Sequence, residues 1–128
     1  KGTILIVSGP KNDPDKKHLH VVCTDPDENG DVLLVPVCSV GTTYHDPTCL
    51  LQDHEHPFLR HDSYICYAKS QVTSTAALTT GIATCAMIVH AEINGQSFLR
   101  VKNGICRSRH TPKKIKNYAG CPAPEPSI

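Results

Sequence analysis

The chain has 128 residues, of which 39% are hydrophobic, and a net charge of +1, so it fits one compact domain and holds too little apolar sequence for two cores. No apolar run approaches the roughly 18–20 residues of a membrane-spanning helix, and the first residues lack the basic-then-apolar order of a signal peptide, so we expect a cytoplasmic protein with no membrane association. Seven cysteines without a Cys-x-x-Cys spacing predict free, reduced thiols.

The first half of the chain is predicted to form short β-strands. A sequence with no Trp and two Phe must build its core mainly from Val, Ile, Leu and Cys, which favours strands over large helices. Apolar runs bounded by turn residues predict strands at 3–7, 18–24, 31–38, 48–51 and 63–69. Asn29-Gly30 suits a hairpin turn, and Pro36 requires an edge or a bulge. Five short strands at this spacing are typical of a small barrel or sandwich.

The second half gives a different pattern. Within residues 70–93, Ala and Leu favour a helix near 76–80, and the later apolar run favours a strand near 84–91. After Asn94, apolar residues at 98, 101 and 105 share one face of a basic amphipathic helix. Thr111 followed by Pro112 predicts an N-cap and a short helix that ends at Tyr118.

These patterns divide the chain into three parts. We predict a β-barrel domain at 1–93, a basic helical segment at 94–118 packed on it, and a flexible, Pro-rich tail at 119–128. Residues 1–96 contain six Lys or Arg against eleven Asp or Glu, whereas 97–128 contain seven against one. The basic end is therefore predicted to bind an acidic partner, or to dock on the acidic body of the protein.

Four segments follow one another in a characteristic order within residues 2–72: Gly2-Thr-Ile-Leu-Ile-Val7, Lys17-His-Leu-His-Val-Val-Cys-Thr-Asp25, Val32-Leu-Leu-Val-Pro-Val-Cys-Ser39 and Asp62-Ser-Tyr-Ile-Cys66. Each segment is similar to a strand of the MazF/PemK family of RNA-cleaving toxins, and their order resembles that of the family. The resemblance implies a mainly β protein with C-terminal helices, built on a small SH3-like barrel of the MazF/CcdB type. It also implies a homodimer with an antitoxin protein as partner.

The same resemblance implies a toxin of a type II toxin–antitoxin system. Its activity would be metal-independent cleavage of single-stranded RNA without a cofactor. The family's Arg at the start of the second strand falls on Lys17 or His18, and its Ser or Thr after the third strand falls on Ser39. The Arg and Asp that some relatives carry after the later Cys fall on Tyr67 and Lys69, so this acid–base pair is absent.

The second predicted strand carries residues suited to RNA cleavage. The reaction needs a base for the 2′-hydroxyl proton, an acid for the leaving oxygen and a cation near the phosphate. His18 and His20 share one strand face, and histidine is a side chain that commonly transfers protons in catalysis. Lys17 could meet the phosphate charge. We therefore predict catalytic roles for Lys17, His18, His20 and Ser39. The alternative is a polar strand face, with Ser39 only forming a turn.

A His-rich segment at 45–61 forms a second group of candidates. It holds four of the eight histidines and Cys49. Cys49 with His54, His56 and His61 could ligate zinc or form a Cys–His nucleophile pair, which would give a zinc-dependent or Cys-dependent hydrolase. The spacing matches no standard zinc module, so we predict no metal. We predict instead that Cys49, His56 and His61 line the functional cleft as catalytic residues.

The remaining candidates are contacts to RNA. Arg and Lys bind phosphates independently of sequence, and aromatic rings stack on bases. The predicted RNA contacts are Tyr67, Lys69, Arg100, Arg107, Arg109 and Lys113. Further rings near the predicted cleft belong to Tyr44, Tyr64 and Phe58. The alternative function is a non-catalytic barrel that binds a protein or a nucleic acid.

Overall fold

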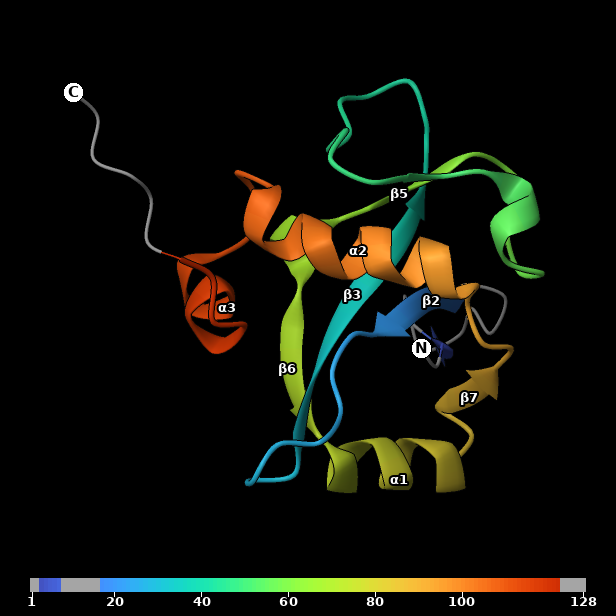
Figure 1. Cartoon of the computed structure of the whole chain (residues 1–128). Coiled ribbons are helices and arrows are strands. Elements are labelled where there is room, and N and C mark those ends of the chain that lie inside the picture. The colour runs from blue at the N-terminus through green and yellow to red at the C-terminus, as the bar shows by residue number, and fades with distance from the viewer. Residues whose placement is uncertain (1–2, 8–16, 123–128) are drawn as a thin grey trace.

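The protein is a mixed α/β structure in which one antiparallel sheet lies between two helical layers (Figure 1). The computed structural model describes residues 3–7 and 17–122, with side chains described from residue 18 onward. The strands are β1 (Thr3–Val7), β2 (Lys17–Val22), β3 (Asp31–Ser39), β4 (Leu50–Leu51), β5 (Ser63–Ile65), β6 (Gln71–Ser74) and β7 (Met87–His90). The helices are α1 (Thr75–Ala83), α2 (Gly95–Arg107) and α3 (Lys113–Tyr118), with short 3-10 helices η1 (Asp53–Glu55) and η2 (Tyr67–Lys69). No helix in these residues is long and apolar enough to cross a membrane.

Strand β3 organises the sheet, because it pairs with three other strands. On one flank it pairs with β2, to which β1 and then β7 are added. On the other flank its first half pairs with β6 and its last residues pair with β5, which in turn pairs with the short β4. All these pairings are antiparallel. In Figure 1, β3 accordingly runs diagonally through the whole molecule.

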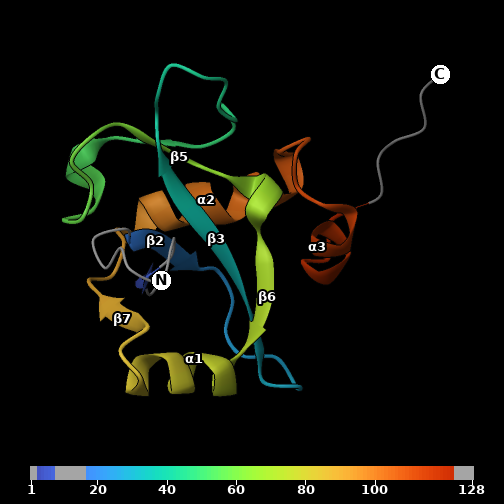
Figure 2. The same ribbon diagram turned by 180° about the vertical axis from the view of Figure 1, so that it is seen from behind.

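The sheet is not closed into a barrel, which corrects the prediction of a small SH3-like barrel. Among the described strands, the hydrogen-bonded path runs β4-β5-β3-β2-β1-β7 with β6 beside β3, and no pairing joins β7 back to the other end. The chain between β6 and β7 forms α1, and both views show this helix leading from the end of β6 to β7 (Figures 1 and 2). The coarser prediction of a sheet with helices at the C-terminal end is confirmed.

Pro36 lies where β3 changes partners on one flank. The ladder with β6 ends at Leu34, and the ladder with β5 begins at Val37. The Pro36 carbonyl accepts a hydrogen bond from the Cys66 N–H on this flank (3.0 Å), and the missing N–H of proline would point the same way. No ladder bond is therefore lost. The sequence predicted an edge or a bulge at Pro36, and the structure has a gap between two ladders on this flank instead.

The predicted strand at 63–69 is wrong beyond Ile65. The chain turns into η2, where Ser70 closes the turn with bonds from its N–H and its hydroxyl to the Tyr67 carbonyl. It then forms β6, which the sequence analysis missed. The helix near 76–80, the strand within 84–91 and the helix after Asn94 are confirmed as α1, β7 and α2.

The two faces of the sheet bury separate clusters of apolar side chains. The main core lies between one face and helices α2 and α3, and it includes Leu19, Val21, Leu33, Val35, Val37, Val101, Ile105 and Ile115. A smaller cluster lies under α1 and consists of Val32, Leu34 and Leu78. Alternate residues of β3 point to opposite faces, so Leu33 and Leu34 enter different clusters. The buried apolar residues of β3 thus hold all three helices to one sheet.

Tyr67 joins the sheet to α2 inside the main core. Its side chain is 0% exposed, and its hydroxyl donates a hydrogen bond to the Val101 carbonyl (2.6 Å). A Cβ atom at Gly104 would lie 2.5 Å from the Tyr67 ring carbon Cζ and closer still to its hydroxyl oxygen. Gly104 is therefore required by the ring that it faces. Tyr67 cannot contact RNA in this structure, which corrects that prediction.

Substituting Gly104→Ala should lower the free energy of unfolding by about 3 kcal/mol, because the added methyl overlaps Tyr67 and breaks its hydrogen bond to Val101. Urea unfolding measures this loss. The control is Gly95→Ala, because a Cβ there meets nothing within 4 Å. Equal stability of the two variants would contradict the packing described for Tyr67.

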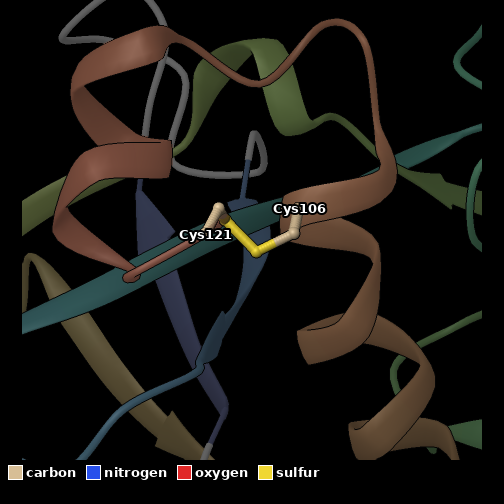
Figure 3. The surroundings of a disulfide bond; sticks show 2 residues. All are labelled: Cys106 and Cys121. Atoms are coloured by element: carbon tan, nitrogen blue, oxygen red, sulfur yellow. A yellow bond between two sulfur atoms is a disulfide. The ribbon is translucent and has the colours of Figure 1, made fainter. Parts of the chain in front are cut away.

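A disulfide between Cys106 and Cys121 corrects the prediction that all seven cysteines are reduced. It joins the end of α2 to the turn after α3, as Figure 3 shows. The remaining cysteines are free thiols: Cys23, Cys38, Cys49, Cys66 and Cys85. The bridge also corrects the predicted tail, because residues 119–122 are tied to the body. Residues 123–128 lie outside the described part.

Replacing both bridge residues by serine should lower the free energy of unfolding by about 3 kcal/mol, because a loop with a sequence separation of 15 would no longer be closed in the unfolded chain. Denaturant titration under non-reducing conditions gives the value. Cys85→Ser serves as the matched control, since Cys85 is free and exposed. If the double variant unfolds like the control, the bridge does not constrain the unfolded chain.

Candidate nucleic-acid interface

The predicted catalytic residues of β2 are not assembled into a reactive group. His20 is 9% exposed, and burial lowers its pKa although its Nδ1 donates a hydrogen bond to the His18 carbonyl (3.0 Å). His18 is exposed. Lys17 begins the strand, but its side chain lies outside the described residues. A substrate on the surface would therefore meet His18, while His20 is covered as a neutral imidazole.

Ser39 lies at the exposed end of β3, where it pairs with Ser63 of β5. Its position in the sheet is as the sequence predicted, directly after the apolar part of the strand. His20 pairs with Pro36, three residues before Ser39 along β3. At about 3.3 Å of rise per residue, this separation is roughly 10 Å, too far for direct proton transfer between the two side chains.

His56 holds the His-rich segment against the rest of the protein. The Phe58 N–H donates to Nδ1 of His56 (3.0 Å), so the ring proton is assigned to Nε2, which donates to the Ala91 carbonyl (2.9 Å). Burial lowers the pKa of His56, in keeping with a neutral ring. His56 thus fastens the loop to the segment after β7, and both ring nitrogens are occupied.

Cys49 and His61 do not complete a catalytic or metal site with His56. Cys49 is buried, and burial raises the pKa of its thiol, which disfavours the nucleophilic thiolate. His61 is exposed. Within the described residues, no group of three or more His, Cys, Asp or Glu could hold a metal ion. A cavity of about 230 Å³ beside this loop contains none of Cys49, His56 and His61 in its lining, which is formed by His54, Glu55, Asn94, Gln96, Ser97 and Arg100.

Arg100 binds the body of the protein rather than pointing freely into solvent. Its guanidinium pairs with Glu55 (2.6 Å) and also donates to the Leu50 carbonyl. Burial opposes ionisation of Glu55, but hydrogen bonds from Ser97 and Arg100 outweigh it and lower the pKa of this carboxyl. This is the only ion pair among the described residues. At this position the basic segment docks on the acidic body, as one alternative predicted.

One exposed ring and three half-buried rings gather where the loop after β3 meets β5 and the end of α2. The hydroxyl of Tyr44 lies 2.9 Å from Nε2 of His110, and the two rings meet edge to face with centroids 5.6 Å apart. His45 and Tyr64 form a second pair, with centroids 5.3 Å apart. Tyr44 is 66% exposed. We call Tyr44, His45, Tyr64 and His110 the ring surface.

A buried carboxylate fixes the ring surface to the helical segment. One oxygen of Asp46 accepts a hydrogen bond from the Ser108 hydroxyl (2.5 Å), and the other accepts from the backbone and hydroxyl of Thr48 (3.0 and 2.6 Å). The Ser108 oxygen accepts in turn from the His110 N–H (3.1 Å). The loop that carries Tyr44 is therefore held to the turn that carries His110.

Two of the predicted RNA contacts flank the ring surface. Arg107 and Arg109 are exposed and stand on either side of Ser108. Residues 93–124 contain no Asp or Glu, so no acidic residue nearby in the sequence offsets their charge. The three other exposed candidates are engaged or placed elsewhere: Lys69 ends η2, Arg100 pairs with Glu55, and Lys113 begins α3. Arg109 directly precedes His110 of the ring surface, and Arg107 lies three residues before it.

The sequence analysis named Tyr44 and Tyr64 but missed the ring surface as a unit. Tyr44 and His110 are 66 residues apart, and no pattern within either segment indicates the other. Exposed rings offer faces on which unpaired bases stack, and adjacent arginines bind the phosphates of the same strand. The arrangement is suited to binding a single-stranded nucleic acid.

Comparisons with known proteins identify no relative: no family model matches the chain, and no match was found among curated proteins or solved structures. The resemblance to MazF/PemK toxins therefore stays a prediction from the sequence. The function of the chain has to be inferred from its own residues.

The pH dependence of stability tests the anchor at Asp46. Burial raises the pKa of this carboxyl, but hydrogen bonds from Ser108 and Thr48 outweigh burial and lower it below its ordinary value of 3.8. A lowered pKa stabilises the fold above about pH 4, and this contribution is lost as the pH falls through the folded value. We expect Asp46→Asn to lower the melting temperature at neutral pH and to reduce its fall in acid. Asp53→Asn, at an exposed carboxyl, is the control; identical pH profiles for both variants would contradict the anchor.

Proposed function

We propose that the chain binds single-stranded RNA at the ring surface. The observation that carries this proposal is the exposed ring of Tyr44, held against His110 beside Arg107 and Arg109. Neither arginine forms an ion pair with a described residue, so both charges are available to phosphates. Single strands expose the faces of their bases, whereas a duplex hides them in its stack. The choice of RNA over DNA rests on the resemblance to MazF/PemK toxins.

Metal-independent cleavage of the bound RNA is the second candidate function. It is favoured by the half-buried imidazole of His110, which contacts the Tyr44 hydroxyl and follows Arg109. An imidazole can remove the 2′-hydroxyl proton, the freed oxygen then attacks the phosphorus, and the 5′-oxygen leaves with a proton from an acid. Arg109 would balance the charge that gathers on the phosphate. This proposal moves the chemistry from His18 and His20 to the ring surface. The antitoxin partner and the homodimer stay predictions of the resemblance.

Binding can be measured as the fluorescence anisotropy of a short labelled single-stranded RNA. Tyr44→Ala should weaken binding about tenfold or more, because a base stacked on an aromatic ring contributes about 1–3 kcal/mol. Arg109→Ala should weaken binding and reduce the slope of log affinity against log salt by about one. Arg60→Ala is the matched control, because Arg60 is exposed and lies outside the ring surface. Loss of binding in the control alone, or in no variant, would reject the proposal.

The same samples separate binding from cleavage. A long single-stranded RNA is incubated with the protein in EDTA, beside His110→Ala and His20→Ala. Fragments that disappear only with His110→Ala support cleavage at the ring surface. Fragments that disappear only with His20→Ala would return the chemistry to β2. RNA that is bound but stays intact would indicate a protein that binds RNA without cleaving it.

A further inference from the structure

A cavity of about 670 Å³ lies between the end of α2 and α3, apart from the ring surface. Pockets for small molecules usually measure about 300–1,000 Å³, so its size suits a nucleotide. Cys106 and Cys121, whose disulfide is drawn in Figure 3, belong to the lining of this cavity. The other lining residues are Thr111, Lys113, Lys116, Asn117 and Pro122.

The charge of this cavity is positive. Lys113, Lys116 and Asn117 follow the spacing of one helical face, which turns both amines and the amide toward the same side of α3. No carboxylate lines the cavity. Neither lysine forms an ion pair within the described part of the chain. Two amines that share a cavity without a counterion favour an anionic ligand.

A buried hydroxyl in the wall points to the same chemistry. Thr111 is 6% exposed, and its Oγ1 has no hydrogen-bond partner among the described residues. Thr111 was predicted to cap α3, but Pro112 occupies the cap position and the Thr111 side chain makes no capping bond. An unpaired buried hydroxyl costs about 1–3 kcal/mol, so a partner that arrives with a ligand would remove this cost.

We propose that this cavity binds the phosphate group of a nucleotide. The amines of Lys113 and Lys116 supply the charge, and the Asn117 amide can donate a hydrogen bond to a phosphate oxygen. The Thr111 hydroxyl is shielded from solvent in the free protein and can donate a second hydrogen bond after rotation about its Cα–Cβ bond. The disulfide and Pro122 offer an apolar wall to the remainder of the ligand. The phosphate can come from a free mononucleotide or from an internal phosphodiester of RNA. The site goes beyond RNA binding at the ring surface and stands or fails separately from it.

The test is a titration of the ¹⁵N-labelled full chain, with its disulfide intact, followed by NMR. The probes are adenosine 5′-monophosphate, which carries a terminal phosphate, and a dinucleotide whose only phosphate is an internal diester. Sodium chloride of equal ionic strength is the blank. We expect saturable shifts of the Thr111, Lys113, Lys116 and Asn117 amides. Tighter binding of the monophosphate would assign the site to free nucleotides, and tighter binding of the dinucleotide would assign it to RNA.

Variants decide which groups make the site. Lys113→Gln/Lys116→Gln should weaken binding about tenfold or more, because each amine would hydrogen-bond a charged oxygen. Lys102→Gln, at an exposed lysine of α2 outside the cavity, should bind like the wild type. Thr111→Val should also weaken binding, yet it should raise the melting temperature of the free protein, because it removes an unpaired hydroxyl.

Three results would overturn the proposal. The first is the absence of saturable shifts near α3 with both probes. The second is equal affinity of the folded double lysine variant and Lys102→Gln. The third is unchanged affinity in Thr111→Val. Tyr44→Ala should leave the monophosphate affinity unchanged, so failure of the ring surface and failure of this cavity are distinguishable.

Discussion

One flank of β3 pairs with two different strands, β6 and β5, and the positions of α1 and of the loop after β3 depend on this division. A strand flank offers a single row of hydrogen-bonding groups, so β6 and β5 must divide it, and Pro36 stands where the division falls. Before Pro36 the chain is held to β6, which leads directly into α1. After Pro36 it is held to β5, and the loop after β3 projects toward the end of α2. The carboxylate of Asp46 in that loop then meets Ser108.

Local patterns predicted most helices and strands, though not η2 and β6, whereas contacts between distant segments determined how they are arranged. The spacing of apolar residues located α2, because the residues that form one face of a helix recur within about a dozen positions of the sequence. Barrel closure was wrong because it depends on the segment after β6, and there the chain forms α1. The density of histidines misdirected the site prediction, since His56 serves to fasten a loop. The ring surface could not be predicted because its central contact joins Tyr44 to His110, far apart in the chain.

The disulfide and the predicted cytoplasmic location favour different environments. Disulfides persist mainly in oxidising compartments, whereas RNA binding would place the protein with nucleic acid inside the cell. The attachment of α3 to the body does not depend on the disulfide alone, because Ile115 is buried in the main core. Reduction would therefore leave two thiols in the wall of the proposed phosphate-binding cavity, while the core contact of α3 and the hydrogen bond from the Cys121 N–H to the Lys116 carbonyl (3.0 Å) remain. The bridge restrains the cavity more than it defines the fold.

The two proposed binding regions share one short stretch of backbone. His110 contacts Tyr44 on the ring surface, and the next residue, Thr111, lines the phosphate cavity. A single strand of RNA that runs along this stretch would meet both regions, and changes at His110 or Thr111 would then affect both together. Tyr44 belongs to one region and Lys116 to the other, so the length of the RNA tests whether one strand occupies both. An oligonucleotide that fills one region should lose affinity with only one of the two substitutions, whereas a longer strand that occupies both should lose affinity with either.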